Sequence, residues 1–315
     1  MENLKELGEF GLISRIDALF KAPEGYVGIG DDCAVMPQKN GMQTLVSTDM
    51  LIEGTHFILE DISPRELGWK SAAVNFSDIA GCGGRATGSF LSLALPGKLD
   101  GEWMEEFISG YKEMSSEAGA PLLGGDTTSS PDRLCINVTV VGEVQEGHAK
   151  LRSAARVGDL VCVTGPLGDS AAGLKLILEG LPREETLIGR HYRPVPRLSE
   201  GQALAAIDEV HAMMDISDGV ASDLRHILKA SRVGARIFES RLPLSEALRS
   251  ACDRYGWDPV RLALEGGEDY ELLFTIAPEG LDKITIPHSV IGEIIEGQGI
   301  RWESSDADYM GFRHF

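Results

Sequence analysis

The chain has 315 residues, more than one hydrophobic core usually holds, so we expect two domains of about 150 residues each. With 43% hydrophobic and 25% charged residues, the composition is typical of a soluble globular protein. The formal net charge of -20 argues against a nucleic-acid partner, because such partners require clustered Lys and Arg.

The chain shows neither a signal sequence nor a membrane span. Residues 1–7 lack the apolar core of a secretory signal, and no stretch approaches the ~18 apolar residues of a span. We therefore expect a cytoplasmic protein with no membrane partner. The five cysteines form no C-x-x-C pair, which favours reduced thiols over a zinc or redox motif.

The start of the chain predicts a short helix followed by β-structure. Residues 12–19 carry apolar side chains at helical spacing. Residues 44–49 form a β-rich run, whose polar end would place Asp49 at the end of a strand.

The clearest helix start is Ser63-Pro64-Arg65-Glu66, which combines an N-cap serine, a first-turn proline and a capping-box glutamate. The glycines at residues 81–84 would end this helix. Asn75 and Asp78 share one of its faces, which can carry ligands. Lys70, on the same amphipathic helix, is expected to be exposed to solvent or to form a structural ion pair.

Strands and helices continue to alternate toward the middle of the chain. We expect strands at residues 90–95 and 134–141, the second ending at Gly142. Between them lies a helix at residues 103–114, whose aromatic stripe, including Tyr111, indicates core packing.

The polar segment at residues 147–150 interrupts this pattern and predicts a domain boundary, with domains at 1–147 and 148–315. Next come a strand at residues 160–165, a glycine turn and a helix at residues 171–178. Together they form a candidate anion site, although many α/β proteins use such turns for packing alone.

Residues 183–196 are expected to be a loop-rich connection. A strand at residues 213–217 then precedes a helix at residues 218–230, and the acidic turn at residues 265–269 precedes a strand at residues 271–276. Because strands and helices mix in both halves, the fold class is α/β (α+β).

Seven aspartates lie in five short patches, each beside Gly, Ser, Thr or Asn. Such patches supply the hard oxygen ligands that Mg²⁺ prefers. Two carboxylates about 4 Å apart repel by about 4 kcal/mol at an effective dielectric of 20, so convergent patches would require cations or shared protons. Scattered turns are the alternative interpretation. The patches are residues 30–32, 47–49, 75–78, 124–128 and 215–219.

In their order along the chain, these patches resemble the thiamine-monophosphate kinase family of the aminoimidazole ribonucleotide synthetase-like superfamily. Each short motif is unspecific, whereas their succession is highly specific. The resemblance covers nearly the whole chain, at residues 8–10, 28–34, 47–49, 54–57, 70–78, 124–128, 152–153, 165–173, 215–219, 266–271 and 311–315.

The resemblance implies a two-domain fold whose N-terminal domain pairs in a homodimer and whose C-terminal domain covers the nucleotide. It also implies phosphorylation of thiamine monophosphate to thiamine diphosphate by ATP, with several Mg²⁺ ions. The implied metal ligands are Asp32, Ser47, Thr48, Asp49, Asp78, Asp126, Asp215 and Asp218. The implied ATP contacts are Tyr111, Gly125, Arg152 and Ser217, and the implied substrate contacts are His56, Glu268 and Phe312. The family more often has Tyr or Trp at the last of these positions.

The implied reaction needs no general base, because the acceptor is a phosphate oxygen that is largely ionised near neutral pH. The difficulty is to bring two polyanions together, which calls for positioning and charge neutralisation. We therefore expect direct in-line transfer, with Arg152 as a fixed positive group and His56 holding substrate.

Other functions stay open at this point. A superfamily enzyme with a different acceptor, a metal-dependent phosphohydrolase and a non-enzymatic acidic metal-binding protein are all alternatives. The selenide enzyme of the superfamily is disfavoured because no Cys precedes Cys33. The hydrogenase-maturation relative is disfavoured because this chain lacks its C-terminal Cys.

Overall fold

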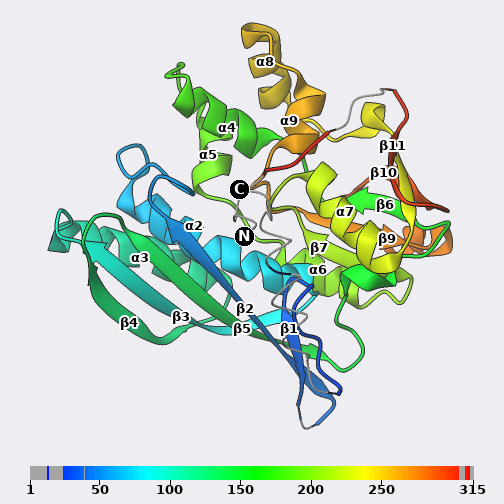
Figure 1. The fold of residues 1–315 in the computed structure, drawn as a ribbon, viewed down its shortest axis with the longest axis horizontal. Coiled ribbons are helices and arrows are strands. Elements are labelled where there is room, and N and C mark those ends of the chain that lie inside the picture. Colours follow the sequence, from blue (N-terminus) through cyan, green and yellow to red (C-terminus); the bar gives the residue numbers. More distant parts are fainter. Residues whose placement is uncertain (1–12, 14–23, 39, 305–308, 313–315) are drawn as a thin grey trace, which may run out of the picture.

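The computed structural model describes residues 13, 24–38, 40–304 and 309–312. Within them the chain forms two β-sheets with associated helices, and the α/β (α+β) prediction is confirmed (Figure 1). The expected helix at residues 12–19, the motif at residues 8–10 and the closing residues 313–315 lie outside the described part.

The N-terminal sheet has five strands in the order β1-β2-β5-β3-β4. Its neighbours pair antiparallel except β3 and β4, which are parallel. Helices α2 and α3 pack together against the sheet (Figure 1). The elements are β1 Ala34–Pro37, β2 Met42–Ile52, α2 Pro64–Gly81, β3 Arg85–Pro96, α3 Gly101–Glu117, β4 Leu122–Ser130 and β5 Cys135–Gln145.

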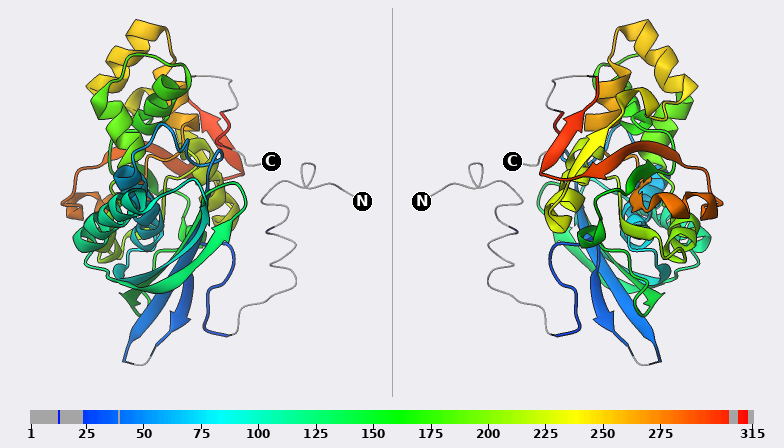
Figure 2. Two further views of the ribbon diagram at one scale, coloured as in Figure 1. Left: turned by 90° about the vertical axis from the view of Figure 1, so that its left-hand side faces the viewer. Right: turned by 90° about the vertical axis from the view of Figure 1, so that its right-hand side faces the viewer.

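The C-terminal sheet has six strands in the order β11-β8-β10-β6-β9-β7. In Figures 1 and 2, α8 and the β1–β2 hairpin lie at opposite ends of the molecule. The strands are β6 Leu160–Val163, β7 Val210–Asp215, β8 Gly234–Ile237, β9 Leu272–Ile276, β10 Ser289–Ile295 and β11 Gly299–Trp302. The helices are α4 Asp169–Leu178, α5 Glu185–Tyr192, α6 Leu198–Ala205, α7 Val220–Ser231, α8 Glu246–Tyr255 and α9 Pro259–Glu265, with short 3-10 turns η1 Arg152–Ala154, η2 Glu239–Arg241 and η3 Pro278–Lys283.

Helix α2 joins the two halves of the molecule. Its predicted start is confirmed, because Ser63 and Glu66 form a reciprocal capping box. The predicted amphipathic character is wrong, since the helix is buried from Leu67 to Gly81 except at Asp78. It contacts β2 and β5 of one sheet and also α6 and β7 of the other half, so it has no solvated face there.

Several predicted boundaries also differ from the structure. Strand β2 continues to Ile52, so Asp49 lies inside the strand rather than at its end. Strand β5 continues past Gly142. The segment expected to be a loop-rich connection contains α5, which buries Leu187 and Tyr192.

The predicted anion site at the start of α4 is filled by the protein itself. The Asp269 carboxylate accepts hydrogen bonds from Gly168 N at 2.7 Å and from Ser170 N at 3.4 Å. Because a carboxylate stabilises the positive end of a helix, Asp269 takes the place that an external anion would occupy. This glycine turn therefore serves packing and capping.

None of the helices in the described residues is long and apolar enough to span a membrane. The cytoplasmic location stays a prediction.

Candidate active site

Five aspartates from distant parts of the chain face one another where the two halves meet. They are Asp32 before β1, Asp49 in β2, Asp78 in α2, Asp215 at the end of β7, and Asp218, which follows β7. Their charges interact across the group, with Asp49 acting on Asp78 and Asp32 acting on Asp215. The structure thus joins four of the five patches, and we call these five residues the aspartate cluster.

The approach of Asp32 to the end of α2 depends on a glycine. A Cβ atom on Gly81 would lie 2.2 Å from Asp32 Oδ2 and 2.9 Å from Asp215 N. Asp32 Oδ2 also accepts a hydrogen bond from Asp215 N at 3.3 Å. The helix stop predicted at residues 81–84 therefore also permits two carboxylates from different domains to come together.

Helix α2 fixes the cluster against strand β2. Ser47 Oγ donates a hydrogen bond to Asp78 Oδ2, and Asp49 N donates to Asn75 Oδ1 at 3.1 Å. Asn75 Nδ2 in turn donates to Ser71 O at 3.0 Å. Asn75 and Asp78 therefore lie on the same face of α2, as their three-residue spacing predicts. That face contacts β2 rather than solvent.

Burial makes the charged state of the cluster unfavourable. Desolvation, followed by the charges of its aspartate neighbours, raises the pKa of Asp78 well above its usual value. Desolvation and Asp32 raise the pKa of Asp215 to about 8, and the same two causes raise that of Asp49 to about 6, although Asp49 remains accessible to solvent. The cluster therefore favours bound protons or cations.

Arg152 neutralises part of this charge. Its Nε donates to Asp32 Oδ1 at 2.8 Å, its Nη2 donates to the same oxygen, and its backbone N donates to Asp31 Oδ1 at 2.7 Å. Desolvation still raises the pKa of Asp32, with Arg152 opposing the change. The guanidinium predicted to contact ATP is thus held in place by the cluster.

The donor set fits Mg²⁺ better than a soft metal. In the described ranges, no three His, Cys, Asp or Glu side chains converge into a ready-made metal cage. The cluster nevertheless offers carboxylate and hydroxyl oxygens, and Mg²⁺ characteristically combines one or two carboxylates with water and substrate phosphates. Asp32, Ser47, Asp49, Asp78, Asp215 and Asp218 are the residues that would hold it.

Two predicted ligands, Thr48 and Asp126, lie on the other face of the N-terminal sheet. Side chains alternate along a strand, so Ser47 and Asp49 face α2 while Thr48 faces outward, where its Oγ1 lies 3.0 Å from Thr139 Oγ1. Asp126 is exposed on the edge strand β4, in register through β3 and β5 with the outward-facing Met50.

Gly125, a predicted ATP contact, is in register with Asp49 across the sheet but three strands away. Strand spacings of ~4.8 Å separate the two backbones by about 14 Å. One copy of the chain therefore does not bring the patch at residues 124–128 to the cluster.

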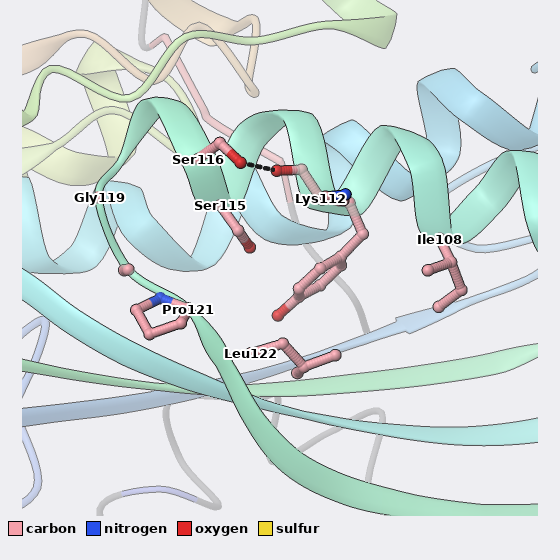
Figure 3. A pocket seen from close by; sticks show the side chains of 9 residues that line it. Ile108, Lys112, Ser115, Ser116, Gly119, Pro121 and Leu122 are labelled. Atoms are coloured by element: carbon pink, nitrogen blue, oxygen red, sulfur yellow. Dashed lines mark hydrogen bonds between the residues drawn. The ribbon is translucent and has the colours of Figure 1, made fainter.

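Tyr111, another predicted ATP contact, lies between α3 and the sheet. Its side chain is buried, its hydroxyl donates to Ser89 Oγ at 2.9 Å, and desolvation raises its pKa to about 12. Tyr111 lines a mostly apolar cavity of about 450 Å³ together with Lys112, Ser115 and Leu122 (Figure 3). The predicted core role of Tyr111 is confirmed, and the cavity beside it can accept a flat apolar group.

Backbone hydrogen bonds place two of the predicted substrate contacts, Glu268 and Phe312, beside the cluster. Glu268 N donates to Ser217 O at 2.8 Å, and Phe312 N donates to Asp218 O at 3.0 Å. Ile52 N donates to His56 Nδ1 at 3.0 Å, which leaves Nε2 as the outer ring nitrogen. Ser217, Glu268 and Phe312 therefore lie around one edge of the aspartate cluster.

Two further acidic residues lie near the cluster: Asp223, which was missed from the sequence, and Asp31, which belongs to the first aspartate patch but not to the implied ligands. Asp223 Oδ2 accepts from Asp218 N at 3.2 Å, and desolvation raises its pKa well above the usual value. Desolvation also raises the pKa of Asp31 to about 6. The available signal for Asp223 was its place in the first turn of the predicted helix, from which a carboxylate can accept a hydrogen bond from an N–H before the helix.

Both halves of the chain match models of one protein family. Residues 30–144 match the N-terminal domain of AIR synthase related proteins, and residues 156–303 match the C-terminal domain. Curated relatives named thiamine-monophosphate kinase include one from Aquifex aeolicus, 39% identical over 99% of both chains, and one from Escherichia coli K12, 41% identical over 98% of both.

Solved structures show the same similarity. A structure of AaThiL complexed with AMPPCP and TMP has a TM-score of 0.92 and 37% identity, covering 100% of this chain and 99% of the other. A thiamine-monophosphate kinase from Stenotrophomonas maltophilia has a TM-score of 0.79 and 37% identity, covering 95% and 98%. The hydrogenase maturation protein HypE of E. coli shares the fold, with a TM-score of 0.68 and 21% identity, covering 86% and 84%.

Proposed function

Because the chain belongs to the AIR synthase related family and, within it, to the thiamine-monophosphate kinases, we propose that it transfers the γ-phosphoryl group of ATP to thiamine monophosphate and forms thiamine diphosphate. The observation that carries the proposal is the full-length similarity to a structure that holds AMPPCP, an ATP analogue, together with TMP. The same similarity supports the two-domain division at residues 147 and 148, which stays a proposal.

The aspartate cluster supports a reaction assisted by several Mg²⁺ ions. The residues of the aspartate cluster would hold the metal, which would supply positive charge against the phosphates of both substrates. Asp78, whose partner Ser47 orients it, and Asp215 supply oxygens that favour a cation. No general base is proposed among the site residues, because the acceptor oxygen is already ionised and in-line attack requires alignment rather than proton removal.

We assign the two substrates to opposite sides of the cluster. Arg152, held by Asp32, would present a fixed positive charge to the ATP phosphates, together with Ser217. Gly125, three strands from the cluster, would contact ATP only through the second copy of a dimer. The cavity beside Tyr111 suits an adenine ring by its volume and apolar lining. Glu268, His56 and the half-exposed ring of Phe312 would receive the thiamine part, whose thiazolium ring carries a permanent positive charge.

Pairing of two copies through the N-terminal sheet is part of the proposal. The outward face and edge of this sheet expose Met50, Phe90 and Leu123, with relative exposures of 53%, 40% and 59%. An apolar surface of this kind favours a partner. Thr48 and Asp126 lie on the same outward face, so a dimer would give both predicted ligands a second protein surface. Sedimentation equilibrium measures the oligomeric state. A monomer would refute the proposed pairing of two copies.

Incubation of the purified protein with ATP, Mg²⁺ and thiamine monophosphate tests the function. Chromatography should show ADP and thiamine diphosphate in equal amounts. ADP without thiamine diphosphate would indicate a hydrolase or a different acceptor. If folded protein in excess Mg²⁺ forms neither product, the result favours a metal-binding protein that does not turn over ATP.

A further inference from the structure

Lys70 has an unusual position for a lysine. Its side chain has 0% exposure, and its Nζ lies 2.8 Å from Glu268 Oε1. The predicted ion pair is therefore confirmed and the predicted solvent exposure is wrong. Because a buried ammonium without a partner would be strongly unfavourable, Lys70 and Glu268 depend on each other across the two halves of the molecule.

The partner carboxylate is held in a strained backbone conformation. Glu268 has φ +65°, in the left-handed region that side chains other than glycine seldom adopt. Tyr270, two residues further on, also has a positive φ of 51°. Positive φ values at residues other than glycine are stable only where surrounding contacts hold the backbone in place. They are concentrated at ligand-binding positions.

The charges around Glu268 keep it ionised. Burial acts to raise its pKa, but Lys70, followed by His191 and His56, leaves that pKa below its usual value. His191 Nδ1 lies 3.3 Å from Glu268 Oε2, and desolvation and Lys70 lower the pKa of His191 to about 3. Since His191 is then neutral near pH 7, the lasting positive charge beside Glu268 comes from Lys70.

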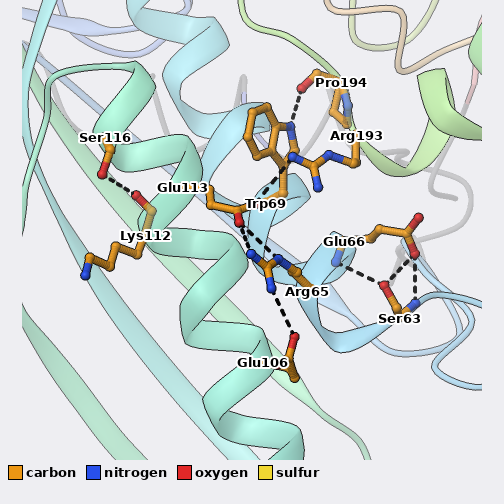
Figure 4. A network of polar contacts seen from close by, with 10 residues as sticks. All are labelled: Ser63, Arg65, Glu66, Trp69, Glu106, Lys112, Glu113, Ser116, Arg193 and Pro194. Atoms are coloured by element: carbon orange, nitrogen blue, oxygen red, sulfur yellow. Dashed lines mark hydrogen bonds and ion pairs between the residues drawn. The ribbon is translucent and has the colours of Figure 1, made fainter.

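The helix turn that carries Lys70 is joined to the segment after α5 through Trp69. Trp69 Nε1 donates to Pro194 O at 2.7 Å, and the Arg193 guanidinium lies 4.1 Å from the centre of the Trp69 ring (Figure 4). This segment directly follows α5, which carries His191. Both neighbours of the Glu268 carboxylate thus belong to one packed unit.

We propose that Lys70 is a positioning residue that holds the Glu268 carboxylate in the orientation needed to bind the cationic ring of the acceptor. This inference rests on the proposed function. Lys70 has no exposed surface with which to touch a substrate, whereas the Glu268 side chain keeps 26% of its surface exposed. One carboxylate oxygen meets Lys70 and the other lies 3.3 Å from His191 Nδ1, so an organic cation would approach Glu268 from the exposed part of its side chain.

Steady-state kinetics of Lys70→Met and Trp69→Phe test the proposal. Because loss of one partner leaves the other buried charge uncompensated and free to reorient, Lys70→Met should raise the KM for thiamine monophosphate at least about 10-fold. The KM for ATP should stay within about twofold. Trp69→Phe removes a buried hydrogen bond from the same helix turn but leaves the ion pair, so it should change stability and neither KM.

Two further variants keep the test decisive. Adding Glu268→Gln to Lys70→Met should cause little further loss, because both changes disable one unit. If Lys70→Met does not fold, Lys70→Arg keeps the charge but alters its shape, and it should still raise the KM for the acceptor selectively. Unchanged kinetics, or an equal rise of both KM values, would overturn the positioning role. Absence of thiamine diphosphate from the wild-type protein would instead refute the proposed function.

Discussion

The aspartate cluster and the exposed strand β4 have similar sequences and opposite environments. Asp78 lies among carboxylates that burial makes unfavourable as anions, whereas Asp126 is exposed on an edge strand. Both aspartates stand beside small and hydroxyl residues that are typical of ligand loops. The difference shows that the chemistry of such a patch depends on which other patches reach it.

The largest expected effect is that of Asp78→Asn. The exchange removes one cluster charge, and metal-assisted charge stabilisation contributes several kcal/mol, so kcat/KM should fall at least about 1000-fold. The fold should persist, because the charged carboxylate is unfavourable there in the absence of a cation. Thiamine diphosphate formation and circular dichroism measure the two outcomes.

The matched control is Asp132→Asn, at a side chain that is 89% exposed. It should leave activity unchanged. Near-normal activity of Asp78→Asn would remove Asp78 from the metal site.

The next effect is a pH dependence of the metal-free protein. The folded pKa values of Asp49 and Asp215, about 6 and about 8, lie above the unfolded value of about 3.9. Their stabilising contribution is therefore fully present below about pH 4 and is lost as pH rises through the folded values. Buried Asp215 accounts for a few kcal/mol of this loss, whereas solvent screening makes the part of exposed Asp49 smaller.

Urea unfolding in EDTA between about pH 5 and pH 8 measures this loss. Saturating Mg²⁺ should reduce it, because the cation replaces the protons in the cluster. A free energy of unfolding that is equally dependent on pH with and without Mg²⁺ would count against metal binding at the cluster.

Gly125→Ala should destabilise β4 by at least about 2 kcal/mol. Gly125 has φ +151°, and an added Cβ would lie 1.7 Å from Leu91 O. Gly124→Ala is the matched control, because its Cβ would meet Phe90 at an ordinary 3.5 Å. Thermal unfolding compares the two variants, and equal melting temperatures would show that the close approach is readily relieved.

The smallest expected effect on stability is that of Asp126→Asn. An exposed edge-strand aspartate should change the free energy of unfolding by no more than about 0.5 kcal/mol. If Asp126 joins the metal site through the proposed dimer, the KM for Mg²⁺-ATP should still rise about 10-fold. A KM for Mg²⁺-ATP identical to that of the wild type would exclude Asp126 from the metal ligands.

Local features of the sequence predicted much of this protein. The capping box at Ser63 and Glu66 defines the start of α2 because its partners are three residues apart. The pairing of Asn75 with Asp78 on one face follows in the same way from helix geometry. The ordered succession of the patches predicted the family, although one copy of the chain brings only four of the five patches together.

Tertiary structure alone decided the environments of these residues. Lys70 is buried because α2 lies between the two halves of the molecule, and a helical pattern does not reveal a second packing partner. Asp269 caps α4 from a segment about a hundred residues further along the chain. Asp126 faces away from the cluster because the strand register places it on the same face of the sheet as Met50. Each outcome depends on contacts between distant segments, whose positions the local sequence does not specify.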